Sequence, residues 1–360
     1  VHTILTFGAV LGIALLVIGM LVARMVLVAS GTPETVLDQA LLYIRIYFVG
    51  IPFMVAYNFG SAIVRSYGDT RRPMCYLIVS GVLNVILNLL LVIGFHLGVA
   101  GVAIATVISN VVSTFLIISH LYRRNDEFSF RFDRMRIDTN ELKKVLAIGI
   151  PAGIQGAIFS VSNVLIQSSI NSFGSTAMAG NAAAVNIEGF VFTSCNSVAQ
   201  ASLTFTSQNL GAGQYKRLRG ITLWCLALGI LLSEILGFIA YGFGNSLLAF
   251  YNKDSEVIAM GMIRMMIVGT TYGLDAIMDI MADIIRGMGS SVMPMIVTLI
   301  GACGFRVVWI YTIFATHHDL RVLYISYPIS WILTSLTHII CYFIVKRRRL
   351  SGLTEGVPSV

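Results

Sequence analysis

Charged residues are scarce in this chain of 360 residues, of which Asp, Glu, Lys and Arg together make up only 11%. A soluble globular domain carries roughly 25% charged residues, so this composition excludes an ordinary soluble fold. The hydrophobic share is 57%, and it is concentrated in long apolar runs. These features predict a polytopic membrane protein whose largest partner is the lipid bilayer.

Cysteine is also scarce, and its spacing excludes further classes. The five cysteines show no C-x-x-C or C-x-x-H spacing, which argues against a metal site or a disulfide scaffold. One aspartate-rich stretch, LDAIMDIMAD, lacks the second such motif that a membrane enzyme binding a diphosphate through magnesium would need. We therefore expect no enzymatic activity and no cofactor. The sequence gives no signal for oligomerisation.

Ten apolar runs are long enough to cross a hydrocarbon core of about 30 Å, which takes roughly 20 helical residues. They predict an all-α protein with spans at residues 3–29, 37–66, 74–95, 99–122, 141–171, 177–208, 220–243, 256–286, 292–314 and 320–345. The stretch Arg123 to Lys144 is the one long polar linker. The predicted parts are an N-lobe at 1–128, a linker at 129–140, a C-lobe at 141–346 and a tail at 347–360.

The basic residues set the expected orientation. Of the 24 Lys and Arg residues, 18 fall in one set of alternate loops and ends, including Lys346 to Arg349. Cytoplasmic loops carry an excess of Lys and Arg, so both ends of this chain are expected in the cytoplasm. The net charge of +7 is then explained by membrane topology, and a nucleic acid is not expected as a partner.

Two pairs of segments indicate an internal repeat. IRIYFVG at 44–50 resembles IRMMIVG at 263–269 with an offset of 219, and VRSYGDTRRPM at 64–74 resembles IRGMGSSVMPM at 285–295 with an offset of 221. Both copies run from a span through a cytoplasmic turn into the next span, so the repeat is parallel in the membrane. Within the second half three spans precede its copy of the repeat, whereas within the first half only one span does. We expect two further spans ahead of Val1 and twelve in all, in two six-helix bundles.

Four further segments are informative in their order and spacing: GIPFMVAYNFGSAIVRSYGDTRRPM, GVLNVILNLLLVIGFHLGVAGVAIATVIS, GIPAGIQGAIFS and QNLGAGQYKRLR. Through these segments the chain resembles, over essentially its whole length, the multidrug and toxic compound extrusion (MATE) transporters. The resemblance implies a secondary antiporter of the plasma membrane, in which two lobes alternate between inside-open and outside-open states. It also implies export of small organic molecules, driven by entry of protons or sodium.

In such transporters the N-lobe coupling site joins an aspartate of the first span to polar residues of later spans. The resemblance places Asn84, Asn88 and Thr106 at these positions, and Asn88 stands where many members carry aspartate. Amide and hydroxyl oxygens can bind sodium, but an amide carries neither charge nor proton. A sodium site and hydrogen bonding between helices both remain open for Asn84 and Asn88.

Acidic residues within the spans concentrate in the C-lobe. Asp275, Asp279 and Asp283 are four residues apart, so they share one helical face, which cannot look at lipid. Asp283 is expected to pair with Arg286, three residues on. Asp275 has two interpretations: it lines a transport site, or it joins a buried structural network with the similarly deep Arg306, Glu234 and Gln155.

Asp279 and Glu188 have no obvious cationic neighbour at their depth, and Arg264 is expected near the outer end of its span. Asp279 and Glu188 are therefore the preferred functional carboxylates, which would attract a lipophilic cation until a proton or sodium ion displaces it. Drug export by antiport is the leading prediction. The alternative is flipping of lipid-linked saccharides, which would favour a basic cavity.

Overall fold

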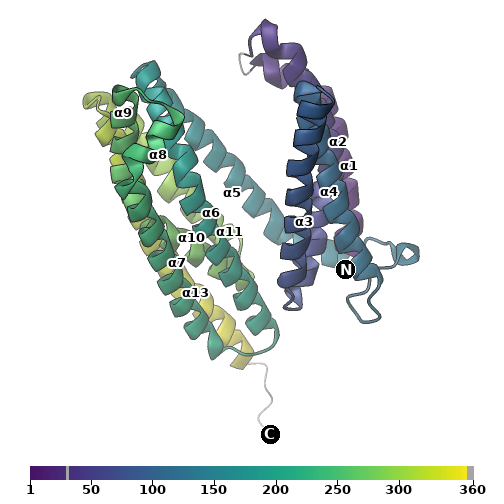
Figure 1. Ribbon diagram of the computed structural model, residues 1–360. Coiled ribbons are helices and arrows are strands. Elements are labelled where there is room, and N and C mark those ends of the chain that lie inside the picture. The colour runs from purple at the N-terminus through teal and green to yellow at the C-terminus, as the bar shows by residue number, and fades with distance from the viewer. Residues whose placement is uncertain (30–31, 355–360) are drawn as a thin grey trace. The chain divides into compact units, whose positions relative to one another are not determined.

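The computed structural model of this chain describes residues 1–29 and 32–354, and these residues form helices and no strand. The predicted all-α fold is confirmed (Figure 1). The chain divides into two compact units, Val1–Val145 and Leu146–Val360. Each unit is a helical bundle with its own buried apolar clusters.

In the first unit α2 packs against α1 and α4, and α3 packs against α4. Its elements are α1 (His2–Ala29), α2 (Glu34–Ser66), α3 (Arg71–Asn88), the π-helical η1 (Leu89–Gly94), α4 (Gly98–Tyr122) and the short 3-10 helix η2 (Phe132–Arg134).

The second unit is built around α10 (Tyr272–Gly287), which packs against α6, α7, α11 and α13. The other elements are α5 (Thr139–Asn171), which begins before the boundary of the units, α6 (Ser175–Gly211), α7 (Arg217–Gly242), α8 (Gly244–Tyr251), α9 (Ser255–Ile267), the 3-10 helix η3 (Gly269–Thr271), α11 (Val292–Thr298), the π-helical η4 (Leu299–Gly304), α12 (Phe305–Trp309), the π-helical η5 (Ile310–Phe314) and α13 (Leu320–Thr354).

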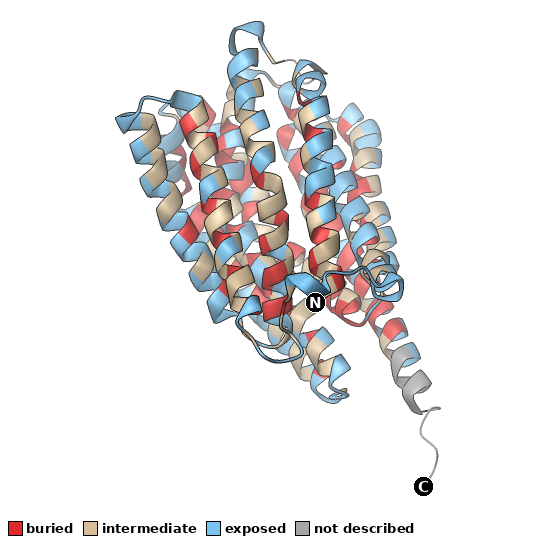
Figure 2. Cartoon of the chain, turned by 90° about the vertical axis from the view of Figure 1, so that its right-hand side faces the viewer, coloured by how far each residue is buried: buried red, intermediate tan, exposed pale blue. Residues whose placement is uncertain are grey.

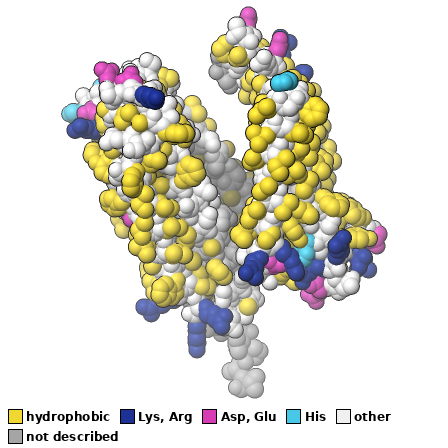
Figure 3. All heavy atoms as spheres, in the orientation of Figure 1, with side chains coloured by type: hydrophobic (Ala, Val, Ile, Leu, Met, Phe, Trp, Pro, Cys, Tyr) yellow, Lys and Arg dark blue, Asp and Glu magenta, His cyan; other side chains and the backbone are white. Residues whose placement is uncertain are grey.

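Among the described residues, nine helical segments are long and apolar enough to cross a membrane, and each coincides with a predicted span. The tenth predicted span is α6, a helix of 37 residues that is not among the nine. Its lower apolarity follows from polar residues such as Asn186, Asn196 and Gln200. Exposed faces of the helices are apolar, as a lipid-embedded surface requires, and charged side chains gather at the ends of the helices (Figure 3).

The internal repeat is visible in the backbone. Pro52 lies inside α2, and the equivalent position with an offset of 219 is Thr271, in the 3-10 segment that separates α9 from α10. With the offset of 221, Leu89 corresponds to Ile310, and both begin π-helical turns. The π-helical turns at Leu89 and Ile310 thus lie at equivalent places and support the predicted repeat, whereas α2 stays α-helical at Pro52 and η4 has no π-helical counterpart in α3.

The linker is less polar in its packing than its sequence suggests. Phe130 is 3% exposed and joins an apolar cluster with Ile117 and Leu121 of α4. Two backbone N–H groups of the linker reach α1: that of Arg131 donates to His2 Nε2 at 3.1 Å, and that of Asp138 to Thr3 Oγ1 at 3.2 Å. The linker is therefore held against the first unit at both ends.

Hydrogen bonds and an ion pair stabilise the two ends of the linker. The carboxylate of Asp138 accepts hydrogen bonds from the backbone N–H groups of Glu141 and Asn140 at the start of α5, and these bonds lower its pKa. The Arg124 guanidinium binds Asp126, lowers the pKa of that carboxyl and lies 4.1 Å from the ring centroid of Tyr67. These contacts order a segment that is otherwise hydrophilic.

Close helix contacts in the second unit depend on glycine. A Cβ atom added to Gly180 in α6 would lie 2.5 Å from the Val257 carbonyl oxygen and 2.8 Å from the Gly261 nitrogen in α9. Small residues at such crossings allow backbones to approach in membrane helix bundles. A Cβ on Gly189, in the same helix, would meet nothing within 4 Å.

We predict opposite effects of alanine at these two glycines. Gly180→Ala should lower the free energy of unfolding by about 1–3 kcal/mol, because backbone atoms of α9 cannot yield without separating the helices. Gly189→Ala should be neutral or stabilising, since alanine favours a helix over glycine by about 0.5–1 kcal/mol. Thermal unfolding of both variants in the same detergent measures the difference. Equal melting temperatures would contradict the close crossing.

Candidate functional site

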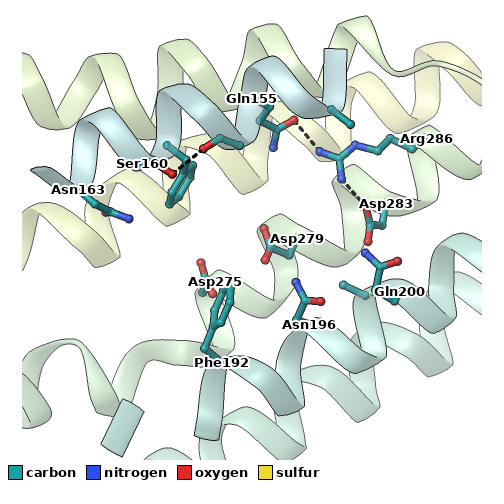
Figure 4. A pocket seen from close by; sticks show the side chains of 14 residues that line it. Gln155, Ser160, Asn163, Phe192, Asn196, Gln200, Asp275, Asp279, Asp283 and Arg286 are labelled. Atoms are coloured by element: carbon teal, nitrogen blue, oxygen red, sulfur yellow. Dashed lines mark hydrogen bonds and ion pairs between the residues drawn. The ribbon is translucent and has the colours of Figure 1, made fainter. Parts of the chain in front are cut away.

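The three aspartates of α10 line one cavity. Its volume is about 350 Å³, and its walls come from α5, α6 and α10. We call it the acidic cavity; its polar lining, shown in Figure 4, consists of Gln155, Ser160, Asn163, Asn196, Gln200, Asp275, Asp279, Asp283 and Arg286. The predicted common face is therefore confirmed, and it looks at a polar cavity inside the bundle. Packing of α10 among its neighbours explains why a membrane helix tolerates these residues.

One carboxylate of the acidic cavity is neutralised in the way the sequence predicted. Asp283 forms an ion pair with Arg286, one turn further along α10. The same guanidinium donates through Nη2 to Gln155 Oε1 on α5 at 2.6 Å. Arg286 thus ties α10 to α5 at one end of the cavity (Figure 4). Gln155, one of the predicted site residues, lines the acidic cavity and bonds to Arg286, so the alternative of a network between Gln155 and Arg306 is not formed.

The other two carboxylates lack such partners. The side chains of Asp275 and Asp279 make no ion pair and no hydrogen bond with any residue that the structure describes. Asp275 is 4% exposed and Asp279 is partly exposed to the cavity. Arg286, the one cation that lines the acidic cavity among the described residues, pairs with Asp283 and not with Asp279. Asp275 forms no ion pair with Arg306 in the described structure, and its side chain lines the acidic cavity.

Glu234 also departs from the predicted network. Its Oε1 accepts a hydrogen bond of 2.9 Å from the backbone N–H of Gly273, in the first turn of α10. A Cβ atom at Gly273 would lie 2.3 Å from this oxygen. The carboxylate therefore caps an N–H group that the break at η3 leaves without an intrahelical partner. It does not line the acidic cavity.

Glu188 has a cationic partner, contrary to the prediction. Its Oε2 accepts hydrogen bonds from Arg264 Nε at 3.0 Å and Nη2 at 2.8 Å, and the two side chains are 2% and 8% exposed. Arg264 Nη1 donates to Asn181 Oδ1 at 3.0 Å, and Tyr324 donates to the same oxygen at 3.1 Å. The expectation that Arg264 extends toward the membrane surface is wrong, and so is the choice of Glu188 as a free carboxylate.

The sequence held a signal for this pair. Arg264 lies nine residues after the start of α9 at Ser255, so a rise of about 1.5 Å per residue places it well inside the membrane. Glu188 lies near the middle of α6. The close crossing of α6 and α9 at Gly180 brings these depths together, and that crossing could not be deduced from residue spacing alone.

A second cavity of about 330 Å³ adjoins the first and shares Phe159, Asn163, Phe192 and Asp275 with it. We call it the arginine cavity, because Arg264 and Arg306 both line it. Its other lining residues include Tyr272, Tyr327 and Trp331. Buried and exposed residues alternate along the helices of the chain (Figure 2). Asp275 is the one acidic residue that lines this cavity in the described chain.

The three N-lobe candidates form local hydrogen bonds. Asn88 Nδ2 donates to Asn84 Oδ1 at 3.0 Å within α3, and Thr106 Oγ1 donates to the Val102 carbonyl oxygen at 3.0 Å within α4. Asn88 Oδ1 is buried without a partner in the described residues. The predicted contacts between helices are not made by these donors. In the described residues no group of three His, Cys, Asp or Glu side chains could hold a metal ion.

The fold and the polar cavities define a polytopic membrane transporter. Residues 1–90 and 151–312 match the model of the MatE family. The chain belongs to this family of MATE transporters, which are integral membrane proteins of drug efflux and not enzymes.

Three known proteins illustrate the relationship. The chain is 28% identical over 366 residues to the probable multidrug resistance protein YoeA of Bacillus subtilis, covering 99% of this chain and 79% of YoeA. It is 26% identical to the FAD transporter of Shewanella oneidensis, covering 75% of this chain and 60% of that protein. The crystal structure of the Vibrio cholerae MATE transporter VcmN in the bent form superposes with a TM-score of 0.86 at 19% identity, over 96% of this chain and 78% of VcmN.

The Glu188 to Arg264 pair yields a stability prediction. Arg264→Met leaves a buried carboxylate without its cation and should lower the free energy of unfolding by about 3–5 kcal/mol. Combining it with Glu188→Met removes both charges and should restore most of the lost stability. Thermal unfolding in detergent measures both effects, with the exposed Arg321→Met as the matched control. A double variant as unstable as Arg264→Met alone would contradict the structural role of the pair.

Proposed function

We propose that this protein exports lipophilic organic cations from the cytoplasm in exchange for protons or sodium ions. The acidic cavity is the substrate and coupling site, with Asp279 as its central carboxylate and Asp275 beside it. The proposal includes a plasma-membrane location with both ends of this chain on the cytoplasmic side. Alternation of two lobes between inside-open and outside-open states, as the family resemblance implies, would carry the cavity from one side to the other.

The charge of the acidic cavity carries this proposal. Three carboxylates line it and one guanidinium, that of Arg286, offsets one of them. Ionised Asp275 and Asp279 therefore leave an excess of two negative charges in a confined space with low polarisability. A cation is the natural complement, because attraction between charges strengthens as water is excluded. Flipping of a lipid-linked saccharide diphosphate is less well supported, since its anionic headgroup would be repelled here.

Apolar and amide groups of the same cavity suit an organic cation. The rings of Phe159 and Phe192 belong to the lining, and aromatic faces attract cations at distances within about 6 Å. Amide oxygens of Asn163, Asn196 and Gln200 add acceptors that sodium also uses. The cavity volume of about 350 Å³ falls at the small end of ligand pockets, which measure about 300–1,000 Å³.

Exchange follows from competition for one carboxylate. Asp279 has no protein partner in the described structure, so its charge is available to whatever enters the cavity. A proton or a sodium ion on this carboxylate cancels the attraction for the organic cation, and the organic cation excludes the coupling ion. Mutually exclusive occupancy is sufficient to couple the two movements in opposite directions.

We predict that Asp279→Asn abolishes coupled export. Proteoliposomes containing the complete protein, oriented inside-out, should accumulate a fluorescent lipophilic cation under an imposed proton gradient or an imposed sodium gradient. The uptake rate of the variant should be at least tenfold lower than that of the unmodified protein, because the amide carries neither charge nor proton. Glu234→Gln is the matched control: it neutralises a membrane carboxylate that does not line the cavity, and it should retain uptake.

Two outcomes would decide against the proposal. Normal gradient-driven uptake by Asp279→Asn would remove that carboxylate from the mechanism. Absence of uptake by the unmodified protein under both gradients would contradict cation export itself. Uptake under only one gradient supports the proposal and identifies the coupling ion.

A further inference from the structure

Arg306 is a buried cation that forms no ion pair with any described residue. It lies in α12, between the π-helical turns η4 and η5, and it is 2% exposed. Its Nε donates to Ser330 Oγ at 2.9 Å. Neither of its Nη groups forms a hydrogen bond with a described residue, and Nη2 is buried. A guanidinium in this environment has donors left over that water would otherwise satisfy.

The neighbouring Arg264 has the carboxylate partner that Arg306 lacks among the described residues. Arg264 lines the same cavity, but its charge is matched by direct bonds to Glu188. Asp275 is the acidic residue on the wall shared with the acidic cavity, and it makes no ion pair with Arg306 in the described structure. The cavity therefore contains one neutralised arginine and one, Arg306, whose two Nη groups make no hydrogen bond with a described residue.

Aromatic rings surround the unpaired guanidinium. Arg306 Cζ lies 4.1 Å from the ring centroid of Tyr327 and 5.7 Å from those of Trp331 and Phe159. All three rings belong to the lining of the arginine cavity. A flat ligand that enters this cavity would meet a cation held against the Tyr327 ring and two further aromatic rings in the lining.

We propose that the arginine cavity is a binding site for an aromatic carboxylate. The carboxylate accepts a charge-assisted hydrogen bond from Arg306 Nη1, the terminal nitrogen that is not buried. The aromatic body of the ligand packs against Tyr327, Trp331 and Phe159. The cavity volume of about 330 Å³ accommodates a ligand of one or two fused rings. This site adjoins the cation site centred on Asp279 and shares Phe159 and Asp275 with it, but its charged group is Arg306.

The negative charge of Asp275 weakens the binding of an anion at this site. Because Asp275 lines both cavities, its negative charge opposes a carboxylate that approaches Arg306. Removing that charge while keeping the shape of the side chain leaves Arg306 with no competing anion. Asp275→Asn should therefore strengthen binding of the carboxylate, whereas loss of a purely structural contact would weaken it.

The test compares 2-naphthoate with its uncharged analogue 2-naphthamide. Isothermal titration calorimetry on the complete protein in a neutral detergent should give at least tenfold tighter binding of 2-naphthoate. Arg306→Gln should abolish this preference, and Asp275→Asn should increase the affinity for 2-naphthoate about threefold or more. Arg321→Gln, which removes an exposed arginine, is the matched control and should change neither affinity.

Equal binding of the two compounds to the unmodified protein would overturn the proposal without any variant. A preference that persists in folded Arg306→Gln would also overturn it. If Arg306→Gln does not fold, the response of Asp275→Asn decides: unchanged or weaker binding of 2-naphthoate contradicts the site. None of these measurements involves a gradient or movement across a membrane, so their failure is distinguishable from failure of cation export.

Discussion

The cost of placing charge in an apolar medium governs the second unit. Three aspartates on one helix would be hard to accommodate in hydrocarbon, because each costs about 2.5–3.5 kcal/mol at the centre of a membrane helix. The bundle meets this constraint by surrounding α10 with α6, α7, α11 and α13. Arg286 pairs with Asp283 at one end of the helix, and Glu234 caps the other. The carboxylates between these ends face a cavity.

Ion pairing distinguishes charged side chains that stabilise the fold from those whose charge is available to a ligand. Glu188 and Arg264 satisfy each other and draw Asn181 and Tyr324 into one buried network, which fixes α6 against α9 and α13. Asp279 and Arg306 have no such partners in the described chain, and each lines a cavity. Asp275 lies where these two cavities adjoin, so its charge acts on ligands in both. Two sites of opposite charge preference can thus coexist in one helical bundle.

Composition and hydrophobic run length were sufficient to predict the all-α fold and the positions of the spans. Residue spacing was sufficient for two features of the site, the common face of the α10 aspartates and the pair between Asp283 and Arg286, because both depend on one helix. It failed for Glu188 and Arg264, whose meeting depends on the α6 to α9 crossing. Depth along a span gives one coordinate, whereas a contact between helices also requires their rotation and their order in the bundle.

The matched π-helical turns bear on the ancestry of the chain. Each widens a helix at the same place in its half, beginning at Leu89 and at Ile310. A π-helical turn inside an α-helix is rare, so two separate origins at equivalent positions are a poor explanation. A single gene segment that already encoded this widened turn, and was then duplicated, accounts for both. The feature is then older than the duplication and was retained while the sequences around it diverged.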